Sequence, residues 1–461
     1  MSDSKILHAS QTLLRRIPAL AALAAVLMSC TGCSRLQTSV EDLMSPPVLT
    51  QEQAEIRSAL SRVSGDSEIK YKYPQNGDYR SSFIFYDIDS DQVEEALVFY
   101  QSPSKGDSTW INILDRQDGQ WVSVCETPAP DTTASIDFVS FEQLTDSQTV
   151  SLVVGWEDAR SGKTVIAYNY DSGRLLPIFE RDYTELAITD LDGNGSTDLV
   201  LFTQQAQSTL VFLACKTENG FETVDSVQLD RNIVSFDNIL SGRTAAGTAA
   251  LFLDSTVDLY ESPFQITDVL SAKRGENGTP VLVNLLDNEE VTLSQGTMRP
   301  AQNLFCRDID GNGTVEIPTV ATLPGYEGIF DESAIFLTSY NQLSPTSQLI
   351  PCQSGVVNPQ HRYLLTFPER WLDNAVSAVV QPENGEYTFF AYTGDLSDTS
   401  TVLLKLRVYS AKDYHDKFDD NYFQLIGQKG LFEYYAYLPE THNSLTITEQ
   451  ELREEMFRFL D

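Results

Sequence analysis

The stretch DLDGNGSTDLVLF runs from Asp190 to Phe202 and joins two different patterns. Acidic, amide and glycine residues fill its first part, and an apolar run of strand-forming side chains fills its last part. The same spacing recurs in DIDGNGTVE from Asp308 and in DIDSDQVEE from Asp87. Because each acidic loop runs directly into an extended segment, the sequence predicts a repeated unit in which such a loop joins two strands.

Each of these loops offers side-chain oxygens at loop positions 1, 3, 5 and 9 and a backbone carbonyl at position 7. Calcium takes six to eight oxygen ligands, so the convergence of these groups on one point would satisfy it. Glycines in the second and third loops let the chain curl around an ion. The predicted calcium ligands are Asp87, Asp89, Asp91, Val93 and Glu95 in the first loop, Asp190, Asp192, Asn194, Ser196 and Asp198 in the second, and Asp308, Asp310, Asn312, Thr314 and Glu316 in the third.

Two other interpretations of these loops have to be weighed. An EF-hand uses the same opening positions, but it requires a glutamate at position 12 and a helix on each side. Position 12 is Val98, Leu201 and Thr319 in the three loops, which excludes the EF-hand. The other interpretation, a set of solvated turns rich in Asp, Asn and Gly, stays open.

Tight turns recur along the same region at intervals of about 50 residues, the length of a four-stranded propeller blade. The turn dipeptides are Asp118-Gly119, Ser172-Gly173, Asn219-Gly220 and Asn277-Gly278. On this phase the sequence predicts five units, which start near Ser82, Ser135, Leu186, Ile233 and Asn303. The second and fourth units keep the strands but lack the acidic loop. The predicted fold class is mainly β, a β-propeller of four-stranded blades followed by a smaller α+β domain.

The predicted domains follow from these patterns. Residues 1–33 form an export signal, 34–66 a tether and a short helix, 67–352 the propeller, and 353–461 the α+β domain. Thr50 and Gln53 form a capping box at the start of the short helix. The last domain should contain four strands, a short helix from about Ser410, and a final helix capped by Thr448 and Glu451 that carries Leu452, Met456, Phe459 and Leu460 on one face.

The N-terminus has the composition of a secretion signal. Basic residues precede an apolar run from Ile17 to Met28, which is too short for a permanent membrane span and ends at small residues and cysteine. This segment resembles a bacterial lipoprotein signal, and the resemblance implies that Cys33, or alternatively Cys30, is lipidated. We therefore expect an extracytoplasmic protein held at the cell membrane by a lipid anchor.

The loops and the strand after each of them resemble the FG-GAP/VCBS repeat family, whose blades are similar to those of the integrin α-subunit propeller. The resemblance covers about residues 67–350 and implies calcium in the strand-connecting loops, although Ser90 stands where the family has glycine. The tail, with LTFPERW and LLKLRVYSAKDYHDKF, is similar to a PsbP/Mog1-like domain that follows such propellers in Firmicutes lipoproteins.

The composition limits which partners the chain can bind and which reactions it can catalyse. Sixty-six acidic against 31 basic residues give a formal charge of -35, which repels nucleic acid. No GxSxG motif is present, and His361, His415 and His442 lack metal-ligand spacing. We therefore expect a non-catalytic protein that binds a protein or glycan partner in the cell envelope. The alternative is an enzyme acting on polysaccharide or the cell envelope, with its site in the propeller channel.

Four cysteines lie beyond the export signal. They are spaced too widely for a CxxC pair, and their pairing stays open: Cys125, Cys215, Cys306 and Cys352.

Overall fold

The structure, a computed structural model, describes residues 50–461 except for short internal stretches and the last residue. Those exceptions are 66–67, 107, 132–133, 146–148, 206–207, 260–261, 288–295, 301–302, 332, 382–384, 411–421, 441–442 and 461. The predicted export signal, both candidate lipidation cysteines and the helix expected after Ser410 therefore lie outside the described residues. The chain divides into two compact units, residues 1–62 and 63–461.

The first described element is helix α3 (Gln51–Ser64). The Thr50 amide donates to Gln53 Oε1 at 3.1 Å, and the Gln53 amide donates to Thr50 Oγ1 at 3.2 Å. These two bonds form the capping box that the sequence predicts at this helix start. No helix in the described part of the chain is both long and apolar enough to cross a membrane.

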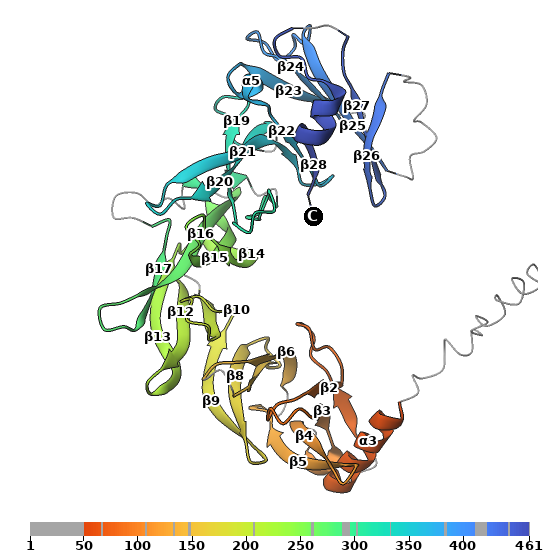
Figure 1. The fold of residues 1–461 in the computed structure, drawn as a ribbon, viewed down its shortest axis with the longest axis vertical. Helices are drawn as coiled ribbons and strands as arrows, with labels where there is room; N and C mark the ends of the chain where they lie inside the picture. The colour runs from red at the N-terminus through yellow and green to blue at the C-terminus, as the bar shows by residue number, and fades with distance from the viewer. Residues whose placement is uncertain are drawn as a thin grey trace, which may run out of the picture. The chain divides into compact units, whose positions relative to one another are not determined.

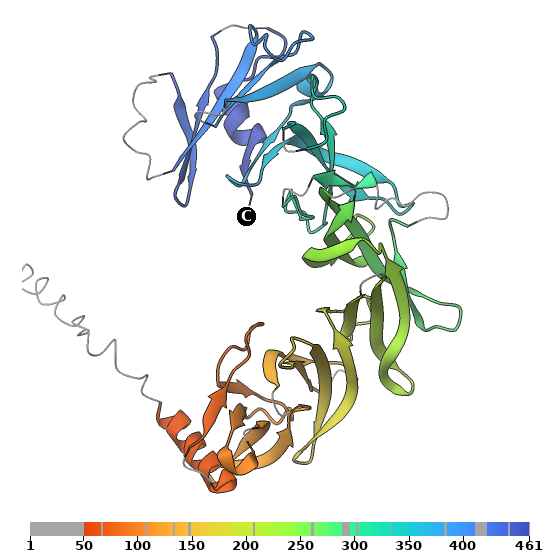
Figure 2. The same cartoon turned by 180° about the vertical axis from the view of Figure 1, so that it is seen from behind.

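The second unit is mainly β and consists of several antiparallel sheets, whose strands can be followed by their labels and colours (Figure 1) and from behind (Figure 2). The first sheet has the order β1-β3-β4-β5, with β2 also paired to β3, and a 3-10 turn η1 (Pro103–Lys105) between β3 and β4. Its strands are β1 (Lys70–Lys72), β2 (Phe83–Tyr86), β3 (Glu95–Gln101), β4 (Thr109–Gln117) and β5 (Gln120–Pro128).

The next three sheets each contain four consecutive strands in sequence order. The second sheet is β6 (Ser135–Glu142), β7 (Ser151–Glu157), β8 (Lys163–Asp171) and β9 (Arg174–Tyr183). The third is β10 (Glu185–Thr189), β11 (Asp198–Gln205), β12 (Ser208–Thr217) and β13 (Gly220–Leu229). The fourth is β14 (Ile233–Arg243), β15 (Ala249–Leu259), β16 (Ser262–Arg274) and β17 (Pro280–Asn284), with β18 (Arg299–Pro300) also paired to β16.

The fifth and sixth sheets contain the C-terminal strands. The fifth has the order β19 (Ile317–Thr322), β20 (Phe336–Leu343), β21 (Leu349–Asn358), β22 (Tyr363–Thr366) and β28 (Phe457–Phe459). The sixth has the order β23 (Val376–Gln381), β24 (Glu386–Ala391), β25 (Val402–Ser410), β27 (Phe432–Tyr437) and β26 (Gln424–Lys429). The helical segments here are α5 (Glu369–Leu372), α6 (Glu449–Glu451) and the π-helical turn η3 (Leu452–Met456).

The repeat that the sequence predicts is present in the strands. The second, third and fourth sheets begin at Ser135, Glu185 and Ile233, at or next to the expected starts. The first sheet also contains β1, before the expected start at Ser82, and the fifth begins at Ile317, later than the start expected near Asn303. Tight turns join β4 to β5, β8 to β9, β12 to β13 and β16 to β17. The backbone φ is +78° at Gly119, +79° at Gly173, +131° at Gly220 and +80° at Gly278, which explains glycine at these turns. Three of these strand pairs, and β20 with β21, also have a register shift, at Ile113/Leu114, Ala167/Tyr168, Leu213/Ala214 and Tyr340/Asn341, whereas β16 and β17 pair without one.

Successive sheets pack against each other through apolar side chains. One buried cluster joins the first and second sheets, for example Phe99 with Trp156, whose ring centroids lie 5.9 Å apart. Further clusters join the second to the third sheet, the third to the fourth, the fourth to the fifth and the fifth to the sixth. Each sheet therefore buries a face against its neighbour in the sequence, as layered β-structure requires.

The C-terminal region differs from the expectation in two respects. The boundary predicted between 352 and 353 falls inside β21, and β21 pairs with β20 on one side and β22 on the other. The final helix has the predicted Thr448/Glu451 capping box and buries Leu452 and Met456. It ends there, however, because the next residues form β28 and pair with β22, so Phe459 and Leu460 lie beyond it. Without β28, the outer edge of β22 would present backbone N–H and C=O groups with no strand partner. Pairing with β28 satisfies these groups, which a further helical turn would not do.

Candidate metal sites

Each acidic loop begins and ends at an equivalent pair of strand residues. The pairs that close the loops are Tyr86 with Glu95, Thr189 with Asp198, and Arg307 with Glu316. The first two loops join antiparallel strands that are consecutive in the sequence, β2 to β3 in the first sheet and β10 to β11 in the third. In the fifth sheet the first strand is reduced to the single bridge between Arg307 and Glu316. The three loops therefore occupy the same place in three different sheets.

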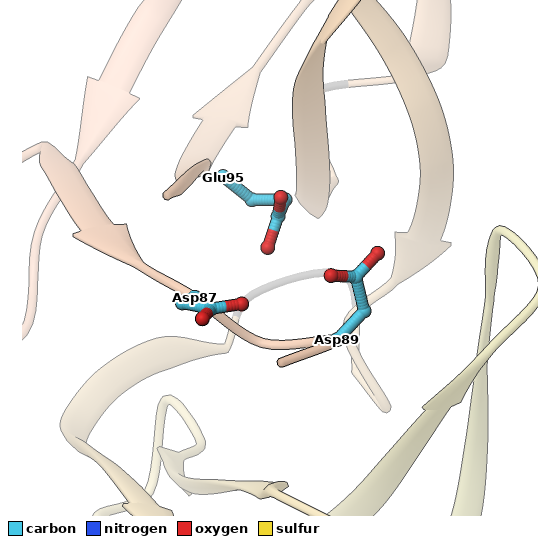
Figure 3. Close-up of side chains that lie close together, drawn as sticks. All are labelled: Asp87, Asp89 and Glu95. Atoms are coloured by element: carbon cyan, nitrogen blue, oxygen red, sulfur yellow. The ribbon is translucent and has the colours of Figure 1, made fainter. Parts of the chain in front are cut away.

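The structure brings together the carboxylates at positions 1, 3 and 9 of every loop. In each loop one ligand atom from each of the three side chains lies within 4.8 Å of the other two. Figure 3 shows Asp87, Asp89 and Glu95 pointing toward one another, the first two from the loop and the third from the start of β3. The equivalent groups are Asp190, Asp192 and Asp198 in the second loop and Asp308, Asp310 and Glu316 in the third.

Backbone N–H groups hold these carboxylates in one shared geometry. In the second loop, Asn194 N donates to Asp190 Oδ1 and to Asp192 Oδ1, both at 3.0 Å, and Gly195 N donates to Asp190 Oδ2 at 2.9 Å. The first loop has the same bonds from Asp91 N and Gln92 N, and the third has them from Asn312 N and Gly313 N. Identical hydrogen bonding at three places indicates a defined loop structure rather than unrelated solvated turns.

The carboxylate at position 9 is the buried member of each site. Glu95 is 2% exposed, and Asp198 and Glu316 are 0% exposed. One oxygen of each accepts a backbone N–H, from Ile88 at 2.9 Å, Leu191 at 2.9 Å and Ile309 at 3.0 Å. The other oxygen of Glu95 and of Asp198 is buried with no hydrogen-bond partner among the described residues. Glu316 instead accepts from Gln342 Nε2 at 3.1 Å, a partner that the loop pattern does not reveal.

Burial and crowding of negative charge also change the acidity of these groups. Burial, reinforced by Asp89 and Asp91, raises the pKa of Glu95 to about 7. Burial, reinforced by Asp192, raises the pKa of Asp198 to about 7, and burial raises the pKa of Glu316 as well. A buried carboxylate with an unused oxygen gains from a cation, because a cation supplies both the missing contact and the missing charge.

Positions 5 and 7 are linked to each other by hydrogen bonds within each loop. Asp91 is not part of the converging group in the first loop. The position-5 side chains instead accept the backbone N–H of position 7, from Val93 at 2.8 Å, Ser196 at 2.7 Å and Thr314 at 2.7 Å. Asn194 and Asn312 also donate their amide Nδ2 to the position-3 carboxylate. These bonds are local Asx turns, and the carboxylates that converge in every loop are those at positions 1, 3 and 9.

The loops differ in their backbone conformation. Positions 4 and 6 have positive φ in all three loops. The second and third loops have glycine there, at Gly193, Gly195, Gly311 and Gly313. The first loop has Ser90 at +64° and Gln92 at +73°. A left-handed conformation costs a residue with a side chain about 1–2 kcal/mol, so the first loop is strained where the others are not.

The second and third loops also contact the sheet that precedes them. Thr197 N donates to Gln143 O at 3.1 Å, and Val315 N donates to Arg243 O at 2.9 Å. Both donors stand at loop position 8, and both acceptors lie at the end of the first strand of the preceding sheet. The first loop has Glu94 at this position and no preceding sheet in the repeat. Two of the three acidic loops therefore connect neighbouring sheets.

Other candidate groups do not join these sites. Among the described residues Cys125, Cys215, Cys306 and Cys352 are all unpaired, and the first three are buried. His361 is half-buried, and burial lowers its pKa. His415 and His442 lie outside the described residues.

A second group of ionisable side chains, centred on Asp137, is not among the residues predicted from the sequence. Tyr183 and Lys163 both contact the Asp137 carboxylate, at 2.8 Å and 3.0 Å. Two features of the sequence indicate this group. Asp137 is a charged residue between two apolar residues of a predicted strand, and Gly155 is an isolated glycine in another strand. Glycine inside a strand often marks the close approach of another group.

Comparison with known proteins gives no family assignment. No family model and no curated protein matches the sequence. Three similar solved structures are rhamnogalacturonan lyase YesW, a rhamnogalacturonan lyase of Bacillus licheniformis and a protein of Lactobacillus plantarum. Their TM-scores are 0.29, 0.29 and 0.28, at 11%, 10% and 10% identity, over 62%, 71% and 72% of this chain. The matches cover 64%, 70% and 85% of those chains, so this chain spans 64% of the first of them.

Proposed function

We propose that this chain is an extracytoplasmic, lipid-anchored lipoprotein whose β-propeller-type repeats are stabilised by calcium and serve in binding or scaffolding at the cell envelope. The observation that carries the calcium part is the repeated site, in which three carboxylates converge in the same hydrogen-bonded loop in three sheets. The donors are all carboxylate oxygens, which suit a hard cation such as calcium and not a soft metal.

The role of the metal in this proposal is structural. The unpartnered oxygens of Glu95 and Asp198 are buried, so their desolvation is uncompensated among the described residues. A cation bound by these oxygens would stabilise the folded chain, since the unfolded chain has no assembled site. In the second and third loops the same cation would hold position 8 against the preceding sheet.

Calcium stoichiometry tests this part of the proposal. We expect about three calcium ions per chain after equilibrium dialysis against free calcium in the millimolar range, because extracellular calcium sites have dissociation constants of about 0.1–1 mM. Asp190→Ala and Asp308→Ala should each lose one ion. The matched control is Asp158→Ala, because Asp158 also accepts two loop N–H groups, from Arg160 and Gly162, but belongs to no converging carboxylate group among the described residues. Equal calcium content in all four proteins would refute the sites.

The anchor and the partner need separate experiments. Mass spectrometry of the mature N-terminal peptide should find lipid on Cys33 or Cys30. An unmodified Met1 would refute the anchor. Crosslinking and pull-down of the anchored protein from its native envelope should then recover the protein or glycan partner.

The second candidate function is an enzyme that acts on polysaccharide. The observation that favours it is a cavity where Asp137, Lys163 and Glu185 lie together, because acidic and basic side chains side by side in a cavity are a common catalytic arrangement. Release of reducing ends from envelope polysaccharide by the purified protein would support this candidate over a binding role.

A further inference from the structure

A cavity of about 340 Å³ lies apart from the three acidic loops. Its walls come from three sheets: the segment before β2, the strands β6 and β8, and the junction of β9 with β10. Asn76, Asp137, Lys163, Tyr183 and Glu185 give it a polar side. The cavity is of the size that small-molecule sites have in proteins.

Asp137 is the centre of the polar side and is 5% exposed. Its Oδ1 accepts from Asn76 Nδ2 at 2.6 Å, and its Oδ2 accepts from the Tyr183 hydroxyl at 2.8 Å and lies 3.0 Å from Lys163 Nζ. Burial raises the pKa of Asp137, but these three donors outweigh burial and lower it. Asp137 is therefore an ionised, fixed carboxylate that holds Lys163 in place at the cavity.

The fold makes room for this arrangement at one glycine. A Cβ atom at Gly155 would lie 2.4 Å from Phe138 Cε1 and 2.6 Å from the Tyr183 hydroxyl. Any larger residue would push the tyrosine hydroxyl away from Asp137. Asn76 is also fixed through its backbone, because its N–H donates to Asp137 O at 2.8 Å. The polar side of the cavity is thus built by contacts from separate parts of the chain.

The first sheet contains the same three kinds of group in a different setting. Lys105 Nζ lies 2.7 Å from Glu126 Oε2, and the Tyr100 hydroxyl donates to Glu126. There the ammonium group is covered, with Nζ 3.9 Å from the centre of the Trp110 ring. Lys163 instead lines a cavity, and its side chain is 29% exposed against 16% for Lys105. Lys163 Nζ also lies 5.9 Å from the centre of the Tyr183 ring, but part of its side chain faces the cavity, where it can donate to a ligand.

The residues that line the cavity limit the kind of ligand it can bind. A metal ion is disfavoured, because both Asp137 oxygens already accept from hydrogen-bond donors. An anion is disfavoured, because Glu185 and Asp78 lie on the same walls and the chain carries a charge of -35. The remaining walls include Phe138, Leu186 and Ile188. The ligand therefore needs one apolar face and an edge of neutral hydrogen-bonding groups.

We infer that this cavity binds a neutral sugar ring of an envelope glycan. The apolar C–H face of the ring would pack on the side formed by Phe138 and Leu186, and its hydroxyl groups would accept from Lys163 Nζ and donate to Glu185. This inference deepens the binding role proposed above and rests on it, but it does not depend on calcium, so each can fail without the other.

The test titrates maltose, cellobiose and N,N′-diacetylchitobiose into the full mature protein, followed by ligand-detected NMR and calorimetry. At least one disaccharide should bind with a dissociation constant below about 10 mM. Lys163→Met should weaken that binding about tenfold, the effect of one lost hydrogen bond to a charged group. Glu185→Gln keeps the shape of an exposed side chain and should weaken binding about threefold. Lys105→Met is the matched control and should bind as the wild type does.

Two results would overturn the inference. One is that none of the three disaccharides binds the wild type at about 10 mM. The other is that Glu185→Gln and Lys163→Met, or Glu185→Gln alone if Lys163→Met fails to fold, bind as tightly as the Lys105→Met control. Calcium-dependent melting of the same samples separates this failure from failure of the metal sites.

Discussion

The loop that starts at Asp87 and the loops that start at Asp190 and Asp308 hold their carboxylates in the same way, yet they differ in what surrounds them. The first loop has side chains at two positions of positive φ and no preceding sheet to contact. The other two have glycine at those positions and donate a backbone N–H to the neighbouring sheet. One ligand pattern therefore occurs in two settings, in a loop that only closes a hairpin within a sheet and in loops that also join two sheets.

Removal of the first ligand should have the largest effect and should separate the two kinds of loop. With calcium at a hundredfold excess over its dissociation constant, a site contributes about 2.7 kcal/mol to the free energy of unfolding. Asp190→Ala and Asp308→Ala should each lower the free energy of unfolding by about 3 kcal/mol, because each variant loses its metal ion and its contact with the neighbouring sheet loosens. Asp87→Ala should lose less, since the strained first loop binds calcium more weakly. Urea unfolding in saturating calcium measures all three, and an equal loss at all three sites would contradict the comparison.

Hydrogen exchange should show the sheet contacts directly. Chelation of calcium should speed exchange of the Thr197 and Val315 amides by about a hundredfold, because the loop that presents each donor loosens. The Glu94 amide stands at the same position of the first loop and should change little. Mass spectrometry of exchanged peptides gives the measurement. Unchanged exchange at Thr197 and Val315 would mean that calcium does not strengthen the contacts between sheets.

Calcium affinity should fall as the pH is lowered, and the third loop should depend on pH least. Calcium competes with protons for Glu95 and Asp198, whose pKa is about 7 without metal, so their sites should weaken by up to about tenfold per pH unit below 7. The Gln342 amide already donates to the Glu316 carboxylate, so the calcium affinity of the third loop should fall less as the pH is lowered. Calorimetric titrations at several pH values provide the check, and a pH-independent affinity would show that these carboxylates are not ligands.

The same shifts predict how the metal-free protein responds to pH. A carboxyl group whose pKa is raised in the folded state binds protons more tightly there than in the unfolded chain. Its contribution to stability is therefore present below its unfolded pKa, near 4, and is lost as the pH rises to about 7. The difference in melting temperature between calcium and metal-free buffer should accordingly grow from pH 5 to pH 7. A constant difference would exclude Glu95 and Asp198 as the source.

Relief of backbone strain in the first loop should give the smallest effect. Ser90→Gly and Gln92→Gly should each raise stability by about 0.5–1 kcal/mol, because glycine adopts positive φ without strain. Gly193→Ala should do the reverse in the second loop, where no atom within 4 Å would obstruct the new Cβ. Thermal unfolding in calcium compares the three variants. Destabilisation by both glycine substitutions would show that the first loop is not strained.

Sequence reasoning located the features that are local in the chain. The acidic loops and the hairpin turns each depend on residues within a few positions of one another, so they are visible in the sequence, and their recurrence gives the phase of the repeat. The Asx turns of the position-5 side chains are equally local, but the spacing of the ligands does not show them.

Features that depend on contacts between distant residues were not predictable in this way. Gln342 lies 26 residues after Glu316, and Tyr183 lies 46 residues after Asp137. The contact of position 8 with the preceding sheet depends on how the sheets pack. β28 joins β22 across most of the C-terminal region, so no local pattern marks the end of the fifth sheet.

Thermal unfolding of the full mature chain in calcium and in chelator tests the central claim most directly. We expect a melting temperature several degrees higher in calcium, which rises further with calcium concentration because the ion binds only the folded chain. Asp190→Ala should reduce that difference, whereas Asp158→Ala should leave it unchanged. Superimposable melting curves of the wild-type protein in calcium and in chelator would contradict the account.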